Sequence, residues 1–443
     1  MRDRAADRAW WALAALVVVA AWPVPALASA GRGDGTRRRA ADDPALVQGM
    51  QWNLAQIGAP AAWPRATGRG VTVAVVDSGI AAGHPDLAGA VTQAVDCIGA
   101  RGDPARCRPG GTDTNGHGTH VAGIIAARTG NGRGIASVAP DAKLLAVRVL
   151  DGCPGCPATG SGLDVAAGLR WAVARGADVV NLSLSTTDPA ERGTIEAAVA
   201  EAWQRGVIVV AAAGNGSDST GFAAGDPVLV VTALQRNASL APYDRPLRAS
   251  GWAIAAPGGV QGDTAASCRP GPGQRGIVST FAGATATADD YACLAGTSMA
   301  APHVAGAAAL LRSTGMSPPE VVRRLLATAR DLGPPGPDPF YGAGALDVAR
   351  ALGAPRPTPV AEPGTPLPGR TRAGASGPPA PASFTGAEPR PWRRIALPVS
   401  LLLSASTTAA LVIAHRRREE RTVLAAVEAA HPWSPSPARS PPS

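Results

Sequence analysis

Residues 71–80 read Val-Thr-Val-Ala-Val-Val-Asp-Ser-Gly-Ile, an almost uninterrupted Val-rich run followed by an acidic residue. Strands that are buried on both faces have this composition, whereas the strands of a half-exposed sheet alternate apolar and polar residues. Four more segments share this character, at residues 144–150, 178–182, 207–211 and 228–232. Segments 165–175 and 194–205 have helical spacing and lie between them. This alternation predicts an α/β fold with a parallel sheet covered by helices.

Three polar side chains stand where this pattern predicts strand ends and helix starts. Asp77 ends the first strand, His117 lies in a Gly-rich turn before an apolar helix, and Ser298 begins another helix. Open α/β sheets carry functional groups at the carboxyl ends of their strands. A serine hydroxyl becomes a nucleophile when a histidine removes its proton, and an aspartate orients that histidine. The residues therefore predict a catalytic triad of Asp77, His117 and Ser298.

A fourth polar residue, Asn215, follows the fourth strand in the run Ala211-Ala-Ala-Gly-Asn-Gly216. Its amide is a candidate donor to the oxyanion that forms during acyl transfer. Each of these residues also has a structural explanation, because Asp, Ser and Asn cap helices and turns and a histidine can simply be packed. Their joint occurrence in the chain order Asp, His, Ser favours catalysis.

Residues 50–352 resemble the subtilisin (subtilase) family of serine endopeptidases in the segments around these four residues. The resemblance implies a doubly wound parallel sheet flanked by helices, and peptide-bond hydrolysis through an acyl-enzyme. Ser185 stands where the family often has glycine, so we expect its Cβ to narrow the substrate groove. The substrate-binding residues that the resemblance implies are Ser183, Leu184, Ser185, Ala212, Ala213 and Gly214.

No cofactor and no metal site is predicted. Cys153-Pro-Gly-Cys156 has the spacing of half a zinc site, but no second ligand pair is evident in the sequence. Asp86 resembles a calcium ligand of some subtilases, and because its partner ligands cannot be matched, calcium binding stays open. His120 and His303 lie inside the motifs and are predicted to be packing residues.

Six cysteines form an even set, which is typical of a protein oxidised after export. Proximity suggests the pairs Cys97–Cys107, Cys153–Cys156 and Cys268–Cys293, one of 15 complete pairings. All six lie in stretches rich in Gly and Pro that we interpret as surface insertions.

The ends of the chain predict export and anchoring. Residues 1–30 have the charged, apolar and small-residue regions of a signal peptide, with an uncleaved anchor as the alternative. Residues 353–392 form a Pro-rich linker, and residues 395–414 are free of charge and long enough to cross a bilayer, with a buried core helix as the alternative. Arginines that follow this segment favour a cytoplasmic tail, 415–443.

The formal net charge of +8 comes largely from arginines that flank apolar segments, so no nucleic-acid partner is predicted. The extension at 31–49 is too short to be an independently folding propeptide. This organisation resembles the mycosins, the membrane-anchored subtilases of actinobacterial type VII secretion systems. The resemblance implies three kinds of partner, namely exported protein or peptide substrates, the cell membrane and subunits of the secretion channel. Processing of exported proteins is one expected role, and structural stabilisation of the channel is the alternative.

Overall fold

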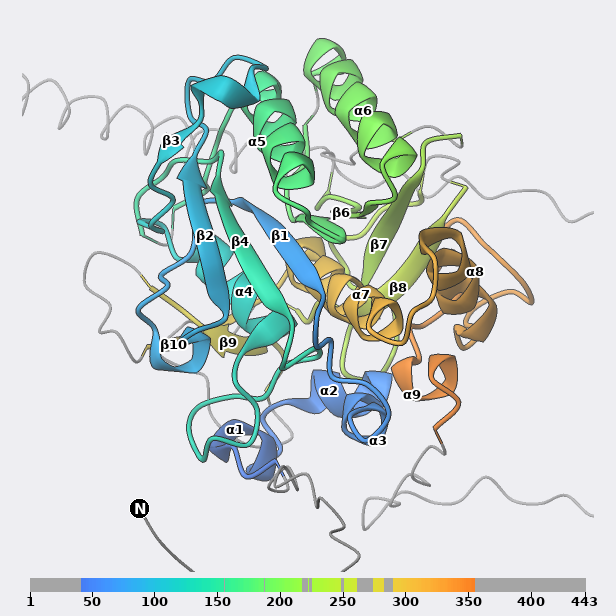
Figure 1. The fold of residues 1–443 in the computed structure, drawn as a ribbon. Coiled ribbons are helices and arrows are strands. Elements are labelled where there is room, and N and C mark those ends of the chain that lie inside the picture. Colours follow the sequence, from blue (N-terminus) through green and yellow to red (C-terminus); the bar gives the residue numbers. More distant parts are fainter. Residues whose placement is uncertain are drawn as a thin grey trace, which may run out of the picture. The chain divides into compact units, whose positions relative to one another are not determined.

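Within the described residues, eight strands form one sheet in the order β3-β2-β4-β1-β5-β6-β7-β8 (Figure 1). Neighbouring strands are parallel except β2 and β3 at one edge. The predicted α/β fold with a mostly parallel sheet is therefore confirmed. The strands are β1 (Thr72–Asp77), β2 (Val91–Asp96), β3 (Arg108–Pro109), β4 (Lys143–Arg148), β5 (Val179–Leu182), β6 (Ile208–Ala212), β7 (Val228–Leu234) and β8 (Ala253–Pro257).

The structure is a computed structural model, and the residues it describes are 41–154, 156–186, 188–216, 222, 225–247, 251–260, 274–282 and 290–354. They belong to the first of two compact units, Met1–Val360, and the second unit lies outside the described residues. The predicted signal peptide, linker, membrane span and tail also fall outside them. In the part of the chain that is described, no helix is both long and apolar enough to cross a bilayer.

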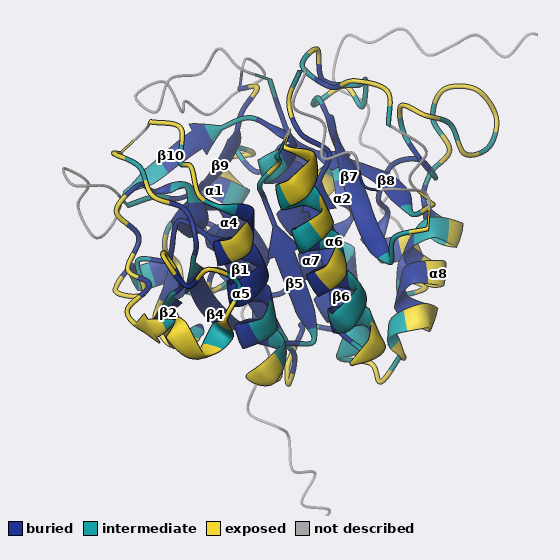
Figure 2. Cartoon of the chain, turned by 90° about the horizontal axis from the view of Figure 1, so that it is seen from above, coloured by how far each residue is buried: buried dark blue, intermediate teal, exposed yellow. Residues whose placement is uncertain are grey.

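The apolar runs form strands that are buried on both faces. Val73 and Val75 of β1 pack into one hydrophobic cluster, whereas Ala74 and Val76 pack into another on the opposite face. Successive side chains of a strand point to opposite faces, so an uninterrupted apolar run fills both layers. Figure 2 shows the central strands β5, β6 and β7 in the colour of buried residues and helices α5 and α6 with exposed residues on their outer sides.

Helices cover both faces of the sheet. Residues of α4 (His117–Ala126), α7 (Thr297–Arg312) and α8 (Pro318–Thr328) belong to the first hydrophobic cluster. The second cluster includes residues of α5 (Gly162–Ala174) and α6 (Pro189–Gln204). The shorter elements are α1 (Pro44–Val47), α2 (Trp52–Ile57), α3 (Ala59–Ala62), α9 (Val348–Ala351), the 3-10 turns η1 (Pro85–Leu87) and η2 (Pro104–Arg106), and the antiparallel hairpin of β9 (Ile277–Thr280) and β10 (Tyr291–Leu294).

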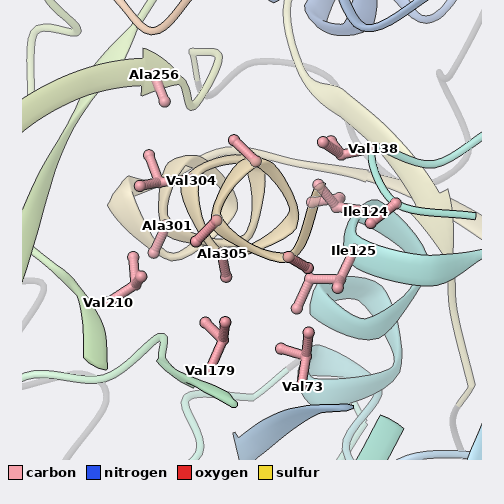
Figure 3. Packing of buried hydrophobic residues seen from close by; sticks show 14 of the residues in the cluster. Val73, Ile124, Ile125, Val138, Val179, Val210, Ala256, Ala301, Val304 and Ala305 are labelled. Carbon is pink, nitrogen blue, oxygen red and sulfur yellow. The ribbon is translucent and has the colours of Figure 1, made fainter. Parts of the chain in front are cut away.

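Helix α7 is the central helix of the first cluster and is buried along almost its whole length. Figure 3 shows Ala301 and Ala305 on the side of α7 that faces Val179 and Val210 of the sheet. Small side chains on this side let the helix lie close to the strands. The first turn of α7 carries Ser298, so this close packing fixes the position of Ser298 relative to the sheet.

The structure corrects several boundaries. The helix predicted at 194–205 begins at Pro189, because Asp188 accepts N-cap hydrogen bonds and proline is favoured in the first turn. The helix predicted at 165–175 begins at Gly162, capped by Ser161. Strands β2 and β8 were not predicted, since the exposed middle of β2 is polar and β8 is rich in alanine.

Two of the predicted disulfides, Cys97–Cys107 and Cys153–Cys156, are present. Cys293 is also disulfide-bonded, and Cys268 lies outside the described residues. The expectation that all cysteines lie on surface insertions is wrong for Cys97 and Cys293. Cys97 is fully buried in the second hydrophobic cluster, and Cys293 is buried in strand β10.

Packing at α7 generates a stability prediction. A Cβ added at Gly306 would lie 2.7 Å from Cβ of Val138, so Gly306→Ala overpacks the core and should lower the free energy of unfolding by about 1–3 kcal/mol. The matched control is Gly193→Ala on the exposed side of α6, where nothing lies within 4 Å of the new Cβ. That change should raise the same free energy by about 0.5–1 kcal/mol. Urea unfolding measures both, and equal effects of the two changes would contradict the packing argument.

Candidate active site

Asp77 and His117 form a hydrogen-bonded pair at the carboxyl end of β1. Asp77 is fully buried, and its Oδ1 accepts hydrogen bonds from Nδ1 of His117 at 2.8 Å and from the backbone N–H of Ser78 at 2.7 Å. The aspartate thus holds the proton on Nδ1, which leaves Nε2 as the basic nitrogen of the neutral ring. A Cβ at Gly118 would lie 2.2 Å from the Gly79 carbonyl oxygen, so the close approach of α4 to this turn requires glycine.

Asp113 organises the turn that leads into α4. This buried carboxylate accepts five hydrogen bonds. The donors are the Ser78 hydroxyl, the backbone N–H groups of Asn115 and Gly116, and both the N–H and the hydroxyl of Thr119. The first N–H groups of a helix have no partner inside it, and Asp113 supplies one. The carboxylate therefore ties the turn after β1 to the start of α4.

The charges around His117 determine its pKa. Burial on its own lowers the pKa of the ring, because a charged imidazolium loses solvation. The charge and hydrogen bond of Asp77, with a further contribution from the charge of Asp113, outweigh burial and raise the pKa above 6.5. His117 is therefore a stronger base than a free histidine, and its imidazole side chain is 25% exposed.

Ser298 is held by a reciprocal pair of hydrogen bonds with Ser183, the first residue after β5. The Ser298 hydroxyl donates to the Ser183 carbonyl at 3.2 Å, and the Ser183 hydroxyl donates to the Ser298 carbonyl at 2.8 Å. Pro302 accounts for the second bond, because proline has no N–H to donate to the carbonyl four residues earlier. Asn181 in turn donates to the Ser183 hydroxyl at 2.9 Å. Two predicted site residues, Ser183 and Ser298, are thus joined directly.

Asn215 is oriented by the residue that precedes Ser298. Its Oδ1 accepts hydrogen bonds from the N–H of Thr297 at 3.0 Å and from the Thr297 hydroxyl at 3.1 Å. The Thr297 hydroxyl accepts one from the N–H of Gly214 at 3.1 Å. These bonds engage the amide oxygen, so the Nδ2 group is the side available to a ligand. A Cβ at Gly296 would lie 3.3 Å from this Nδ2, which places it beside the turn into α7.

His117, Ser298 and Asn215 border one cavity of about 430 Å³. Among the described residues, no hydrogen bond joins Ser298 to His117. Such a bond is often long without substrate and tightens in the complex, so this geometry is compatible with proton transfer between them. The cavity therefore joins a hydroxyl, a base and an amide donor, the groups that acyl transfer requires.

The disulfide loop Cys153–Cys156 forms part of the cavity wall. Cys156 lines the cavity, together with residues 157–160. Asn115 Nδ2 donates to the carbonyl oxygens of Cys153 at 2.7 Å and of Cys156 at 3.0 Å. This loop is therefore fastened to the turn just before His117. Its two cysteines bond each other rather than a metal, which argues against the zinc alternative.

The predicted substrate residues divide into two sets. Ser183, Leu184 and Ser185 line the cavity. By contrast, the structure does not place Ala212, Ala213 and Gly214 on its lining: these three residues are buried, and the N–H of Gly214 faces Thr297. Within the second set, Gly214 donates to the Thr297 hydroxyl, which in turn binds Asn215.

The two other motif histidines lie in the core. His120 and His303 are fully buried, and burial lowers the pKa of His120 to about 3 and that of His303 to about 4. Nε2 of His120 faces the carbonyls of Ile277 and Ala292, so it carries the proton of a neutral ring. These are packing residues, as the sequence predicts.

The surroundings of Asp86 do not fit calcium. Asp86 Oδ1 accepts from Nδ2 of Asn131 at 2.9 Å, and Oδ2 accepts from the N–H of Ile135 at 2.9 Å and the hydroxyl of Tyr291 at 3.0 Å. Calcium is bound by oxygen ligands, whereas amide and backbone N–H groups present protons to the carboxylate. Over the described ranges, no cluster of His, Cys, Asp and Glu has metal-binding geometry.

Sequence reasoning missed Asp113 and Thr297. Asp113 lies four residues before His117, and Thr297 directly precedes Ser298, so both were inside or next to the motifs. Their role depends on burial and on partners distant in sequence, such as Ser78 and Asn215, which a single sequence does not reveal.

Comparison with known proteins identifies the family of the chain. The model of the Subtilase family matches residues 68–344. Subtilisin Savinase of Lederbergia lenta is 39% identical over 312 residues, which cover 69% of this chain and 99% of that protein. Thermitase of Thermoactinomyces vulgaris is 37% identical over 303 residues, 68% of this chain and 95% of that protein. A solved protease structure from Pseudoalteromonas arctica matches with a TM-score of 0.59 and 32% identity, over 71% of this chain and 99% of that one.

The fold and these matches define the class of protein. The chain belongs to the subtilase family, and it is a serine endopeptidase. The family match ends at residue 344, so the predicted linker and membrane span lie beyond it.

The electrostatics of His117 can be tested by NMR titration. We expect the pKa of His117 to lie above 6.5. It should fall by roughly 1–3 units in Asp77→Asn, because this change keeps the burial but removes the charge. It should fall less in Asp113→Asn, because the charge of Asp113 contributes less. The ring thus becomes neutral and basic as pH rises through this value. His303 serves as an internal control with an unchanged pKa, because only burial and the Met299 carbonyl determine its shift. A His117 pKa that does not respond to Asp77→Asn would contradict the assignment.

Proposed function

We propose that this serine endopeptidase cleaves peptide bonds through an acyl-enzyme formed on Ser298. His117 removes the hydroxyl proton as Ser298 attacks the carbonyl carbon, and returns it to the leaving amine. Asp77 holds the ring in the tautomer that exposes Nε2 and stabilises the charged ring. Water then attacks the ester with His117 as the base, which regenerates the enzyme. The observation that carries the proposal is the 2.8 Å pair of the buried Asp77 and the partly exposed His117, beside a cavity that Ser298 also lines.

Two donors stabilise the oxyanion in this scheme. Asn215 Nδ2 is one, because Thr297 engages the opposite side of the amide. The backbone N–H of Ser298 is the other, since Ser298 is the second residue of α7 and the first N–H groups of a helix have no partner inside it. The positive end of the helix dipole adds to the same effect.

Two substitutions test this scheme. Ser298→Ala should abolish peptide hydrolysis and labelling by a serine-directed phosphonate fluoride, because the nucleophilic oxygen is gone. Asn215→Ala should keep the labelling but lower kcat by about 10²–10³, the loss known for the corresponding donor of subtilisin. Circular dichroism checks that both variants fold. Labelling at a serine other than Ser298 would overturn the assignment of the nucleophile.

For the cellular role, we propose a mycosin-like enzyme: an exported subtilase, anchored by residues 395–414 with its tail in the cytoplasm, that processes proteins exported by type VII secretion. The uncharged segment and the arginines after it support anchoring. The described disulfides support an oxidising compartment. Residues 42 and 43 support a short extension that belongs to the enzyme domain, because Asp43 accepts hydrogen bonds from Gly130 and Asn131, and Asp42 from Gly132.

Cell fractionation and secretome analysis test this role. We expect the full chain in the membrane fraction, and release of the protease domain when the chain is shortened to end before residue 395. In cells with Ser298→Ala, uncleaved forms of secreted proteins should accumulate while export continues. Export that stops in a strain lacking the protein but continues with Ser298→Ala would reveal a structural role in the channel as well. A soluble full-length chain, or an unchanged secretome in every strain, would contradict the proposal.

A further inference from the structure

The cavity beside Ser298 contains a carboxylate that the proposed reaction does not use. Glu191 of α6 lines it, and it is the one acidic residue among the described residues that do so. With His117 set aside as the proposed base, every other described lining side chain is uncharged. A lone negative charge in a substrate cavity is a selectivity element, because it attracts cationic groups and repels anionic ones.

Glu191 is fixed from both walls of the cavity. Its Oε1 accepts a hydrogen bond from the N–H of Gly162 at 3.1 Å, and its Oε2 accepts one from the Thr186 hydroxyl at 3.0 Å. A carboxylate has about four acceptor sites, so further capacity remains on both oxygens. The contacts hold the group in place without neutralising its charge, since both donors are uncharged.

Among the described residues, no cation lies within ion-pair distance of the Glu191 carboxylate, and the neighbouring Arg192 forms no ion pair with it. Glu201 on the same helix is paired with Arg170 at 2.8 Å, so α6 offers a direct comparison. Glu191 has no such ion pair within the described residues. Its side chain is half-buried, so solvent screens the charge less than at an open surface.

Apolar side chains surround the position of Glu191. Ile195 lies one helical turn further along α6, and Val165 lies one turn after Gly162 on α5; both are buried and line the cavity. Leu184, two residues before Thr186, also lines the cavity. Lysine and arginine have an apolar stem and a charged end, which is the combination this arrangement accommodates.

Glu191 lies close enough to Ser298 to contact a substrate residue near the cleaved bond. Ser183 is hydrogen-bonded to Ser298, and Thr186 to Glu191. Three residues of chain span at most about 10 Å, so Glu191 lies within reach of a substrate side chain about three residues from the bond that is cleaved.

We propose that Glu191 is a specificity-determining residue that selects substrates with a lysine or arginine near the scissile bond. This inference rests on the proposed function of Ser298. The basic side chain lays its stem against Val165, Leu184 and Ile195, and its charged end donates hydrogen bonds to the free lone pairs of the Glu191 carboxylate. A charge-assisted bond of this kind changes kcat/KM by about tenfold to a hundredfold.

The test uses quenched fluorescent peptides derived from one cleavable sequence. Lys, Arg, Gln, Met or Glu is placed in turn at each position within about four residues of the cleaved bond. With the wild-type enzyme, one position should favour Lys and Arg over Met and Gln by tenfold or more in kcat/KM, and disfavour Glu. The preference should fall as salt is added, because the charge is half-exposed.

Glu191→Gln should remove this preference and leave kcat/KM for the Met and Gln peptides within about twofold, because glutamine keeps an acceptor without the charge. Glu191→Lys should favour the Glu peptide instead. The matched control is Glu201→Gln, which removes a paired carboxylate from the same helix but not from the cavity, and should change nothing in the selectivity. If Glu191→Gln folds poorly, the wild-type preference and its salt dependence carry the test.

Two results would overturn the inference. One is that the wild-type enzyme shows no preference for a basic residue at any position. The other is that Glu191→Gln lowers kcat/KM equally for basic and neutral peptides, which means that Glu191 only holds the cavity residues in place. Failure of the proposed function is recognised separately. In that case the wild-type enzyme would hydrolyse no peptide and would form no phosphonate adduct on Ser298, whatever residue occupies position 191.

Discussion

The parallel pairing of β1 with β5 is the constraint on which the site depends. Val76 lies opposite Leu182 in this register, so the chains leave the sheet side by side at Asp77 and Ser183. Asp77 then binds His117 at the start of α4, and Ser183 binds Ser298 at the start of α7. Backbone hydrogen bonds between two buried strands thus set the spacing of two helix N-termini. A site on strand ends and helix starts is held more tightly than one on loops alone.

Buried polar groups around this edge are nearly all matched with partners. Pro302 removes a helical donor and Ser183 replaces it, and Asp113 collects donors that the start of α4 leaves free. Two exceptions among the described residues at this edge are Oδ1 of Asn181 and Oδ2 of Asp77, which are buried without a hydrogen bond. An unpartnered carboxylate oxygen costs free energy, and attraction to a charged His117 offsets that cost when the ring is protonated. Such local cost is common where a structure serves a reaction rather than its own stability.

The sequence predicted the parts of the molecule whose signal is local. The Val-rich runs identified five central strands, and glycine-flanked Asp77, His117 and Ser298 marked the candidate site. The helix start at Pro189 was misplaced although Asp188 and proline marked it, and β2 was missed because solvent faces its middle residues. The burial of Cys97, the role of Asp113, and the burial of Ala212, Ala213 and Gly214 away from the cavity all depend on segments that meet only in the fold.

The reciprocal bond between Ser183 and Ser298 also bears on how the enzyme comes into being. The ribosome makes the chain from its N-terminus, so Asp77, His117 and Ser183 exist well before α7 emerges. Until then the sheet lacks the central helix of its first hydrophobic layer, and the neighbouring strand ends lack the proposed nucleophile, Ser298. In the proposed mechanism, cleavage therefore requires α7, the last of these elements to be made.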